Sequence, residues 1–153
     1  MVELLIVIAI IAVAVALVSV ALPDSDAARL EEEGERLTAL LELARAEARV
    51  SGASVHWVPR AADATAEATD AVGAPVHFRF VGLPAALALP THWLDDRISA
   101  QVVGSRSLVL GPAAILPAQR VVLRLAQRQL DLSSDGLGPF AVADAVAATE
   151  AAR

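Results

Sequence analysis

The chain of 153 residues contains no cysteine, no lysine and no tyrosine. Without cysteine it has no disulfides, no CxxC redox motif and no thiolate metal ligands. Its basic residues are all arginines, scattered through a chain of formal net charge −6. Nucleic-acid binding depends on clustered basic side chains that neutralise phosphates, so we expect no nucleic acid as a partner. With only two Trp and three Phe, a folded domain must pack mainly aliphatic side chains.

An apolar run at the N-terminus is the most prominent feature that is present. Residues 4–22 include Ser19 as their only polar residue. As a helix this run spans roughly 28 Å, close to the hydrocarbon thickness of a bilayer, about 30 Å. No arginine precedes it, and it is longer than the apolar part of a cleaved signal peptide. We therefore predict that residues 1–22 form a transmembrane helix.

An amphipathic pattern follows over residues 23–51. Apolar residues recur at helical spacing at Leu30, Leu37, Leu41, Ala44 and Ala48. Acidic residues gather early and arginines late, which suits the helix dipole, and we place these charges, Glu33 and Arg45 among them, largely on the other faces. The leucines at 30, 37 and 41 are expected to pack on the chain's own domain. Pro23 leaves two alternatives open, two separate helices or one bent helix.

Beyond Gly52 the periodicity becomes that of strands. Short candidate strands cover residues 54–58, 76–81, 98–103, 107–110, 121–126, 129–133 and 136–142. In residues 121–126 the apolar side chains share one face with Arg124 opposite, and in residues 76–81 His77 and Arg79 are expected to point outward. The predicted fold is α+β, a long N-terminal helix whose first half is transmembrane, followed at 52–153 by a small antiparallel β-sandwich-like globular domain.

Three connections complete this prediction. Residues 59–75 are small, polar and bounded by prolines, which favours a flexible loop. Residues 82–96 are more apolar and are expected to pack onto the domain. Ser134, Asp135 and Gly136 predict a tight hairpin turn, because Asp-Gly supplies the backbone conformations that such turns require.

Candidate chemical sites are few. His56, His77 and His92 are far apart and belong to no HxH or HExxH motif, so no metal site is expected. Asp131, Ser133 and Asp135 match the opening of a calcium-binding loop. However, Val142 occupies the position of its bidentate glutamate, and the hairpin turn is the simpler interpretation. The chain has no GxSxG, P-loop or GxGxxG motif, so we expect neither an enzyme nor a cofactor.

Glu3 is the exception in the apolar segment. An ionised acid at mid-membrane costs at least about 2.5–3.5 kcal/mol, and less near an interface. In one interpretation Glu3 lies at headgroup depth and has no role. In the other it pairs with a positive group, such as an amine, of a neighbouring chain. Such a pair would fix the axial register between helices, because a misplaced acid would stay unpaired.

The stretch VELLIVIAII, residues 2–11, resembles the N-terminus of type IV pilins and type II secretion pseudopilins, whose processed chains begin FTLIELLIVIAII or close to it. The resemblance implies that Glu3 sets subunit register in a filament. It also implies that the apolar helix packs against those of other subunits through Leu4, Leu5, Ile6, Val7, Ile8, Ile10 and Ile11. The family's architecture is a long N-terminal helix, half in the membrane, followed by a β-rich periplasmic domain.

Two further stretches resemble the H-type minor pseudopilins (the GspH/FimT group). LTALLELARAEARVSGASVHW is similar to their helix end and first strand, and LDLSSDGLGPFAV to their C-terminal hairpin. The resemblance implies a subunit of the type II secretion pseudopilus in the bacterial inner membrane, with a periplasmic domain. Its partners would be major and minor pseudopilins and the inner-membrane assembly platform. The alternatives are a FimT-like minor pilin and a membrane-tethered periplasmic binding domain with no filament role.

Family precursors carry a short basic leader that ends in Gly, immediately before the Phe that becomes the new N-terminus. Met1 stands where Leu or Ile would be in the processed family members. We expect a misassigned start or a trimmed sequence, in which case a prepilin peptidase would cleave a leader upstream and the new terminus would be methylated. If the chain is not processed, neither modification carries over.

Overall fold

The computed structural model describes residues 3, 6–8, 25–60, 69, 73, 75–84 and 86–143. Within these residues no helix is both long and apolar enough to cross a membrane. The predicted transmembrane segment, residues 1–22, lies outside the described residues apart from Glu3 and residues 6–8, which are helical.

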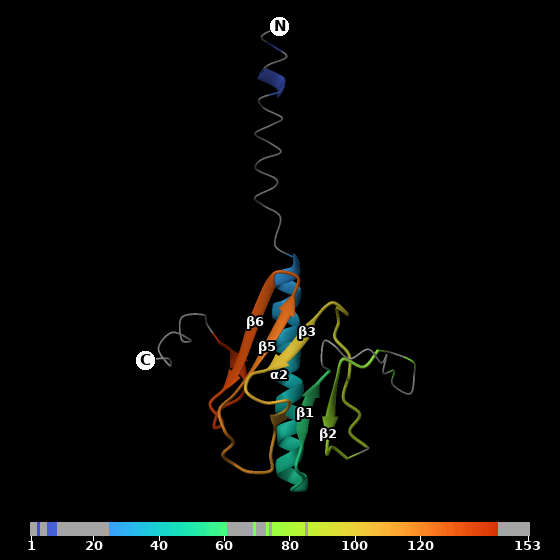
Figure 1. The fold of residues 1–153 in the computed structure, drawn as a ribbon, viewed down its shortest axis with the longest axis vertical. Coiled ribbons are helices and arrows are strands. Elements are labelled where there is room, and N and C mark those ends of the chain that lie inside the picture. The colour runs from blue at the N-terminus through green and yellow to red at the C-terminus, as the bar shows by residue number, and fades with distance from the viewer. Residues whose placement is uncertain are drawn as a thin grey trace.

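The long helix α2 spans Ser25–Ser51 and forms the axis of the described structure (Figure 1). Its composition favours this, because Leu, Ala, Glu and Arg are among the best helix formers. Asp26 in its first turn and Arg49 in its last turn complement the helix dipole. The helix ends where Gly52 adopts a positive φ of 68°, a conformation that costs glycine little.

Seven strands follow and form two antiparallel sheets. The strands are β1 His56–Pro59, β2 Phe78–Val81, β3 Ser99–Val102, β4 Leu108–Val109, β5 Gln119–Leu125, β6 Arg128–Ser134 and β7 Ala141–Val142. One sheet has the order β2-β1-β4 and the other the order β3-β5-β6-β7. The chain is therefore α+β, as the sequence predicts. Each predicted strand overlaps an observed one, but the last, predicted over residues 136–142, is confined to Ala141–Val142.

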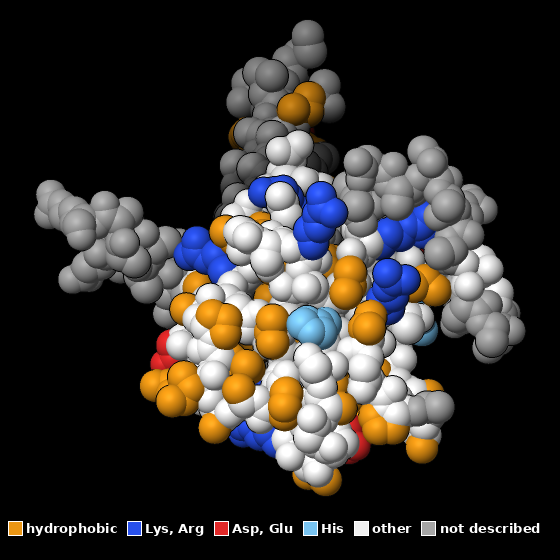
Figure 2. All heavy atoms as spheres, turned by 60° about the horizontal axis from the view of Figure 1, so that its bottom comes forward, with side chains coloured by type: hydrophobic (Ala, Val, Ile, Leu, Met, Phe, Trp, Pro, Cys, Tyr) orange, Lys and Arg blue, Asp and Glu red, His pale blue; other side chains and the backbone are white. Residues whose placement is uncertain are grey.

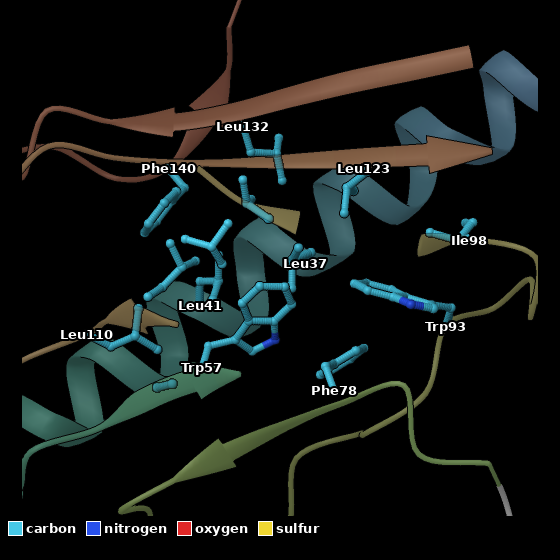
Figure 3. Close-up of a cluster of buried hydrophobic side chains, with 14 of the residues drawn as sticks. Leu37, Leu41, Trp57, Phe78, Trp93, Ile98, Leu110, Leu123, Leu132 and Phe140 are labelled. Atoms are coloured by element: carbon cyan, nitrogen blue, oxygen red, sulfur yellow. The ribbon is translucent and has the colours of Figure 1, made fainter. Parts of the chain in front are cut away.

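A single apolar core joins the helix to both sheets. Figure 3 shows the side chains of Trp57 and Phe78 from one sheet and Leu123 from the other facing Leu37 and Leu41 of α2. Trp93, from the connection 82–96, packs its ring 4.4 Å from that of Phe78 (centroid to centroid). The rings of Trp57 and Phe80 also lie 5.8 and 6.1 Å from that of Phe78, so four of the five aromatic residues form one cluster.

Strand β5 follows its alternating pattern except at Val122, which is also buried although it lies on the opposite face. Val121, Leu123 and Leu125 are fully buried, while Arg124 is exposed on the opposite face. The register with β6 places Leu132 opposite Val121 and Leu130 opposite Leu123, so the apolar faces of the two strands coincide. This face covers α2, which contacts both strands.

The loop between β6 and β7 differs from its prediction, and the predicted loop 59–75 lies mostly outside the described residues. The hairpin between β6 and β7 is not a tight turn over residues 134–136, because its loop runs from 135 to 140. The side chain of Asp135 accepts hydrogen bonds from the backbone N–H groups of Leu137 and Gly138, and this builds the longer loop. Most of the predicted loop 59–75 lies outside the described residues, within which Thr69 and Pro75 form an isolated bridge.

Candidate functional site

The N-terminal residues predicted to drive assembly are described only in part. Glu3 is helical and exposed. Ile6, Val7 and Ile8 are helical and expose 54%, 48% and 54% of their surfaces. Leu4, Leu5, Ile10 and Ile11 lie outside the described residues. Three successive exposed aliphatic side chains give this described stretch an apolar surface.

The predicted helix stripe lies in the domain core. Leu30, Leu37 and Leu41 are almost completely buried, as are Ala44 and Ala48 one and two turns further on. Gly34 lies on the same face, where a β-carbon would clash with the side chain of Leu130. The helix therefore approaches β6 closely, and the apolar stripe faces inward along almost its whole length.

Glu33 is not on an outer face, which corrects the placement expected from the sequence. Its side chain is 1% exposed. One carboxylate oxygen accepts a hydrogen bond of 2.7 Å from the backbone N–H of Leu94, and the other accepts one from the guanidinium of Arg36. Arg36 in turn donates to the carbonyl of His92. Buried carboxylates need such partners, and here they attach the connection 82–96 to α2.

Arg45 is likewise buried rather than exposed, at 2% of its surface. Its guanidinium donates to the carbonyls of Gly136 and Gly138 at 2.8 and 2.7 Å. The carboxylate of Glu42 lies 3.9 Å away. Gly136 must be glycine here, because its φ is 90° and a β-carbon would clash with the Leu116 carbonyl. Arg45 therefore fixes the β6–β7 loop to the C-terminal half of the helix.

A third attachment holds the beginning of α2. Arg97 donates to Asp95 at 2.7 Å and to Asp26 at 3.3 Å, and Arg29 lies 3.2 Å from Asp95. The hydrogen bonds from Arg97 hold the pKa of the Asp95 carboxyl well below its usual range, and the same bond raises the pKa of Arg97. Both arginines are solvent-exposed, so the cluster adds little to stability.

Glu33 and Arg45 are two residues of α2 that the sequence pattern places wrongly, although the sequence contains a usable signal for their burial. The buried positions of α2 are 30, 33, 34, 37, 41, 44, 45 and 48, separated by one, three or four residues. Positions 33 and 45 thus continue the apolar stripe. A charged residue on the buried face of a helix predicts a specific polar partner, although the sequence does not say which one.

The candidate metal ligands do not gather. Among the described residues there is no group of three or more His, Cys, Asp or Glu side chains that could hold a metal ion. Asp135, at the end of the calcium-like stretch, bonds its own loop backbone, and the N–H groups of Gly138 and Leu137 lower its pKa. The ring of His56 lies 3.1 Å from the hydroxyl of Ser54.

His77 is half-buried, although the strand pattern predicts an outward position. Its Nδ1 accepts a hydrogen bond of 3.1 Å from the backbone N–H of Trp93, so the native ring carries no proton on that nitrogen. Asp96 lies 3.8 Å from Nε2. Desolvation by burial outweighs this attraction and lowers the pKa of His77.

Protonation of His77 should therefore destabilise the domain. Because its pKa is lower in the folded than in the unfolded chain, the unfolded chain binds more protons as the pH falls through 6.5. We expect the urea concentration at the unfolding midpoint, measured by Trp fluorescence, to decrease as the pH is lowered from about 7.5 to about 5.5. His77→Asn keeps an acceptor near the position of Nδ1 without titrating, and should flatten this dependence. An equally steep dependence in the variant would contradict the assignment.

Comparison with known protein families, with curated proteins and with solved structures finds no match to this chain. The site is therefore defined by its own geometry. Its described parts are Glu3 and residues 6–8, which are helical and exposed, and the helix α2, which is fixed to the β domain by an apolar stripe and two buried charges.

Proposed function

We propose that this chain is a minor pseudopilin subunit of a type II secretion pseudopilus. The observation that carries the proposal is the acid-headed apolar run VELLIVIAII, which precedes a long helix packed on a small antiparallel β domain. In this proposal residues 1–22 are the transmembrane half of one long helix, and the two sheets are the β-sandwich-like periplasmic domain. No catalytic activity is proposed.

The apolar segment would serve two environments in turn. In the bacterial inner membrane its aliphatic surface, including residues 6–8, contacts lipid. During assembly the same surface packs against the corresponding segments of major and minor pseudopilins, so that it never meets water. Glu3 pairs with a positive group at the N-terminus of a neighbouring subunit, and this pair sets the axial step, since an unpaired acid in an apolar bundle is costly.

The domain would follow the helix as the filament grows. An apolar stripe and the contacts of Glu33 and Arg45 distribute the attachment along α2, from the Leu94 N–H to the Gly138 carbonyl. A displacement of the helix by the inner-membrane assembly platform therefore carries the domain with it. Growth of the filament would in this way help to move exported proteins across the outer membrane.

Changing Glu3 to leucine should abolish assembly while preserving insertion. Leucine is more apolar than glutamate, so the variant should reach the membrane at least as well as the wild type. In a strain that lacks the native gene, we expect the wild-type chain to restore the release of secreted proteins into the medium and Glu3→Leu to fail. The measurement is the amount of secreted protein, with membrane levels of the chain compared by immunoblotting.

Glu31→Leu is the matched control, because Glu31 is an exposed acid on α2. It should restore secretion like the wild type. Full secretion with Glu3→Leu would contradict the proposed role of Glu3 and would favour a membrane-tethered binding domain, which needs no register between subunits. Secretion that never depends on the gene would exclude the secretion role altogether.

A further inference from the structure

A groove of about 730 Å³ lies on the domain, away from the helix attachments. It is bounded by the end of β1, by all four residues of β3, and by the outward side chains of Val122 and Arg124 on β5. Strands β1 and β3 belong to different sheets, so the groove marks the place where the two sheets meet at the surface.

The lining of the groove is basic. Arg60, Arg106 and Arg124 line it, and among the described residues no Asp or Glu does, although the chain as a whole carries a net charge of −6. Arg124 donates to two neutral amides, those of Gln101 and Gln129, at 3.3 and 3.4 Å. Within the described part of the chain neither Arg106 nor Arg124 forms an ion pair. Figure 2 shows arginines spread over one side of the domain, with acidic side chains only near its margin.

One edge of strand β3 borders the groove, with Ala100 partly exposed and Val102 6% exposed. Among the described residues β3 pairs with β5 alone. The N–H of Val103 bonds the carbonyl of Arg120 at 3.0 Å, which fixes the phase of the ladder. By antiparallel alternation Ser99 and Gln101 also direct their backbone groups toward β5, whereas Ala100 and Val102 direct theirs to the other side. Both of these residues line the groove.

We propose that an extended acidic segment of a partner protein adds as a strand to this edge of β3. Its backbone would bond the N–H and C=O groups of Ala100 and Val102, and alternate Asp or Glu side chains would pair with Arg124 and Arg106. Unprotected edges invite such pairing, and β3 carries neither the lysine nor the proline that commonly prevents it. The proposal concerns the domain surface and does not depend on how the N-terminal helix is used.

A peptide fits these observations better than a nucleic acid does. A nucleic acid has no backbone amides to complete a strand edge, and its affinity rests on a long series of phosphate contacts. The groove offers Arg106 and Arg124, together with the backbone groups of Ala100 and Val102 that point away from β5. Charge complementarity therefore selects a carboxylate-bearing partner, and the strand edge selects an extended chain.

The test uses fluorescence anisotropy with the full chain in non-ionic detergent. The probe is a labelled twelve-residue peptide of alternating Thr and Glu, and its control alternates Thr and Gln. We expect the Glu peptide to bind at least about tenfold more tightly, because charge-assisted hydrogen bonds are the stronger ones. The double variant Arg106→Gln, Arg124→Gln should bind the Glu and Gln peptides equally. Arg49→Gln, an exposed helix arginine outside the groove, should leave the preference for the Glu peptide intact.

The strand edge is tested separately. Ala100→Pro removes an outward N–H without removing a bond to β5, and should abolish binding while both arginines remain. If this variant fails to fold, the wild-type chain is tested instead with a Thr-Glu peptide that carries N-methyl groups on alternate residues. This methylated peptide should not bind. Binding by the methylated peptide, equal binding of the Glu and Gln peptides, or tighter binding of a twelve-nucleotide single-stranded DNA through the same arginines would each overturn the proposal.

Discussion

Replacing Arg45 with alanine should lower the free energy of unfolding by about 3 kcal/mol. The variant loses two short hydrogen bonds from a buried cation to the carbonyls of Gly136 and Gly138, together with the packing of the side-chain stem. Hydrogen bonds that involve a charged group contribute about 1.5–3 kcal/mol each, and the two bonds share one side chain. Urea unfolding of the full chain in detergent measures the effect, because Trp57 and Trp93 are both buried and report on the core.

Arg49→Ala provides the control, since Arg49 is exposed one turn further along the same helix. Its effect should stay within about 0.5 kcal/mol. Arg45→Met keeps most of the volume without the donors, and should fall between the wild type and the alanine variant. If Arg45→Ala were no more destabilising than Arg49→Ala, the loop attachment would contribute nothing to the fold.

Replacing Glu33 with alanine should also lower the free energy of unfolding by about 3 kcal/mol. The change leaves the N–H of Leu94 without its acceptor and the partly buried guanidinium of Arg36 without its carboxylate. Both losses occur beneath the connection 82–96, where Trp93 is packed. We expect the unfolding midpoint to move to a lower urea concentration, with an unchanged m-value.

Two variants make this prediction specific. Glu33→Gln keeps an acceptor for Leu94 and loses only the charge, so its cost should be smaller than that of Glu33→Ala. Glu32→Ala changes the neighbouring exposed acid and should be nearly neutral. Equal effects of Glu33→Ala and Glu32→Ala would refute the buried attachment. Twelve residues separate Glu33 from Arg45, roughly 18 Å along a helix, so their effects should add.

The regular part of this fold follows from local pattern. Leu30, Leu37 and Leu41 recur at helical spacing and are buried, and Val121, Leu123 and Leu125 alternate and are buried. In both cases the period of the apolar residues matches the period of the element, and hydrophobic burial then determines which face turns inward. Patterns of this kind need no knowledge of the partner segment.

The misplaced side chains of Glu33, Arg45 and His77 have one physical source, which is polar contact between segments distant in sequence. Arg45 and Gly138 are 93 residues apart, and Glu33 and Leu94 are 61 apart. Charged side chains are usually exposed, so sequence reasoning places them in water unless a partner is known. His77 follows the same rule, since its burial depends on the connection that carries Trp93.

Of the candidate functional features, one can be found from the sequence and the other cannot. Glu3 and its apolar run are apparent from the sequence because an acid at the head of such a run is unusual. The basic groove is not, because Arg60, Arg106 and Arg124 are far apart in the chain and only the pairing of β3 with β5 and the approach of β1 bring them together.

The most direct test of the account is photo-crosslinking through the apolar helix in living cells. A photoreactive residue in place of Ile8, an exposed helical position, would capture whatever packs there. With Glu3 present, we predict crosslinks to other small membrane-anchored subunits. With Glu3→Leu, we predict that their yield falls at least about tenfold at equal membrane levels, because helices out of register do not pack. An unchanged yield in the Glu3→Leu background would contradict the claim that this acid directs assembly.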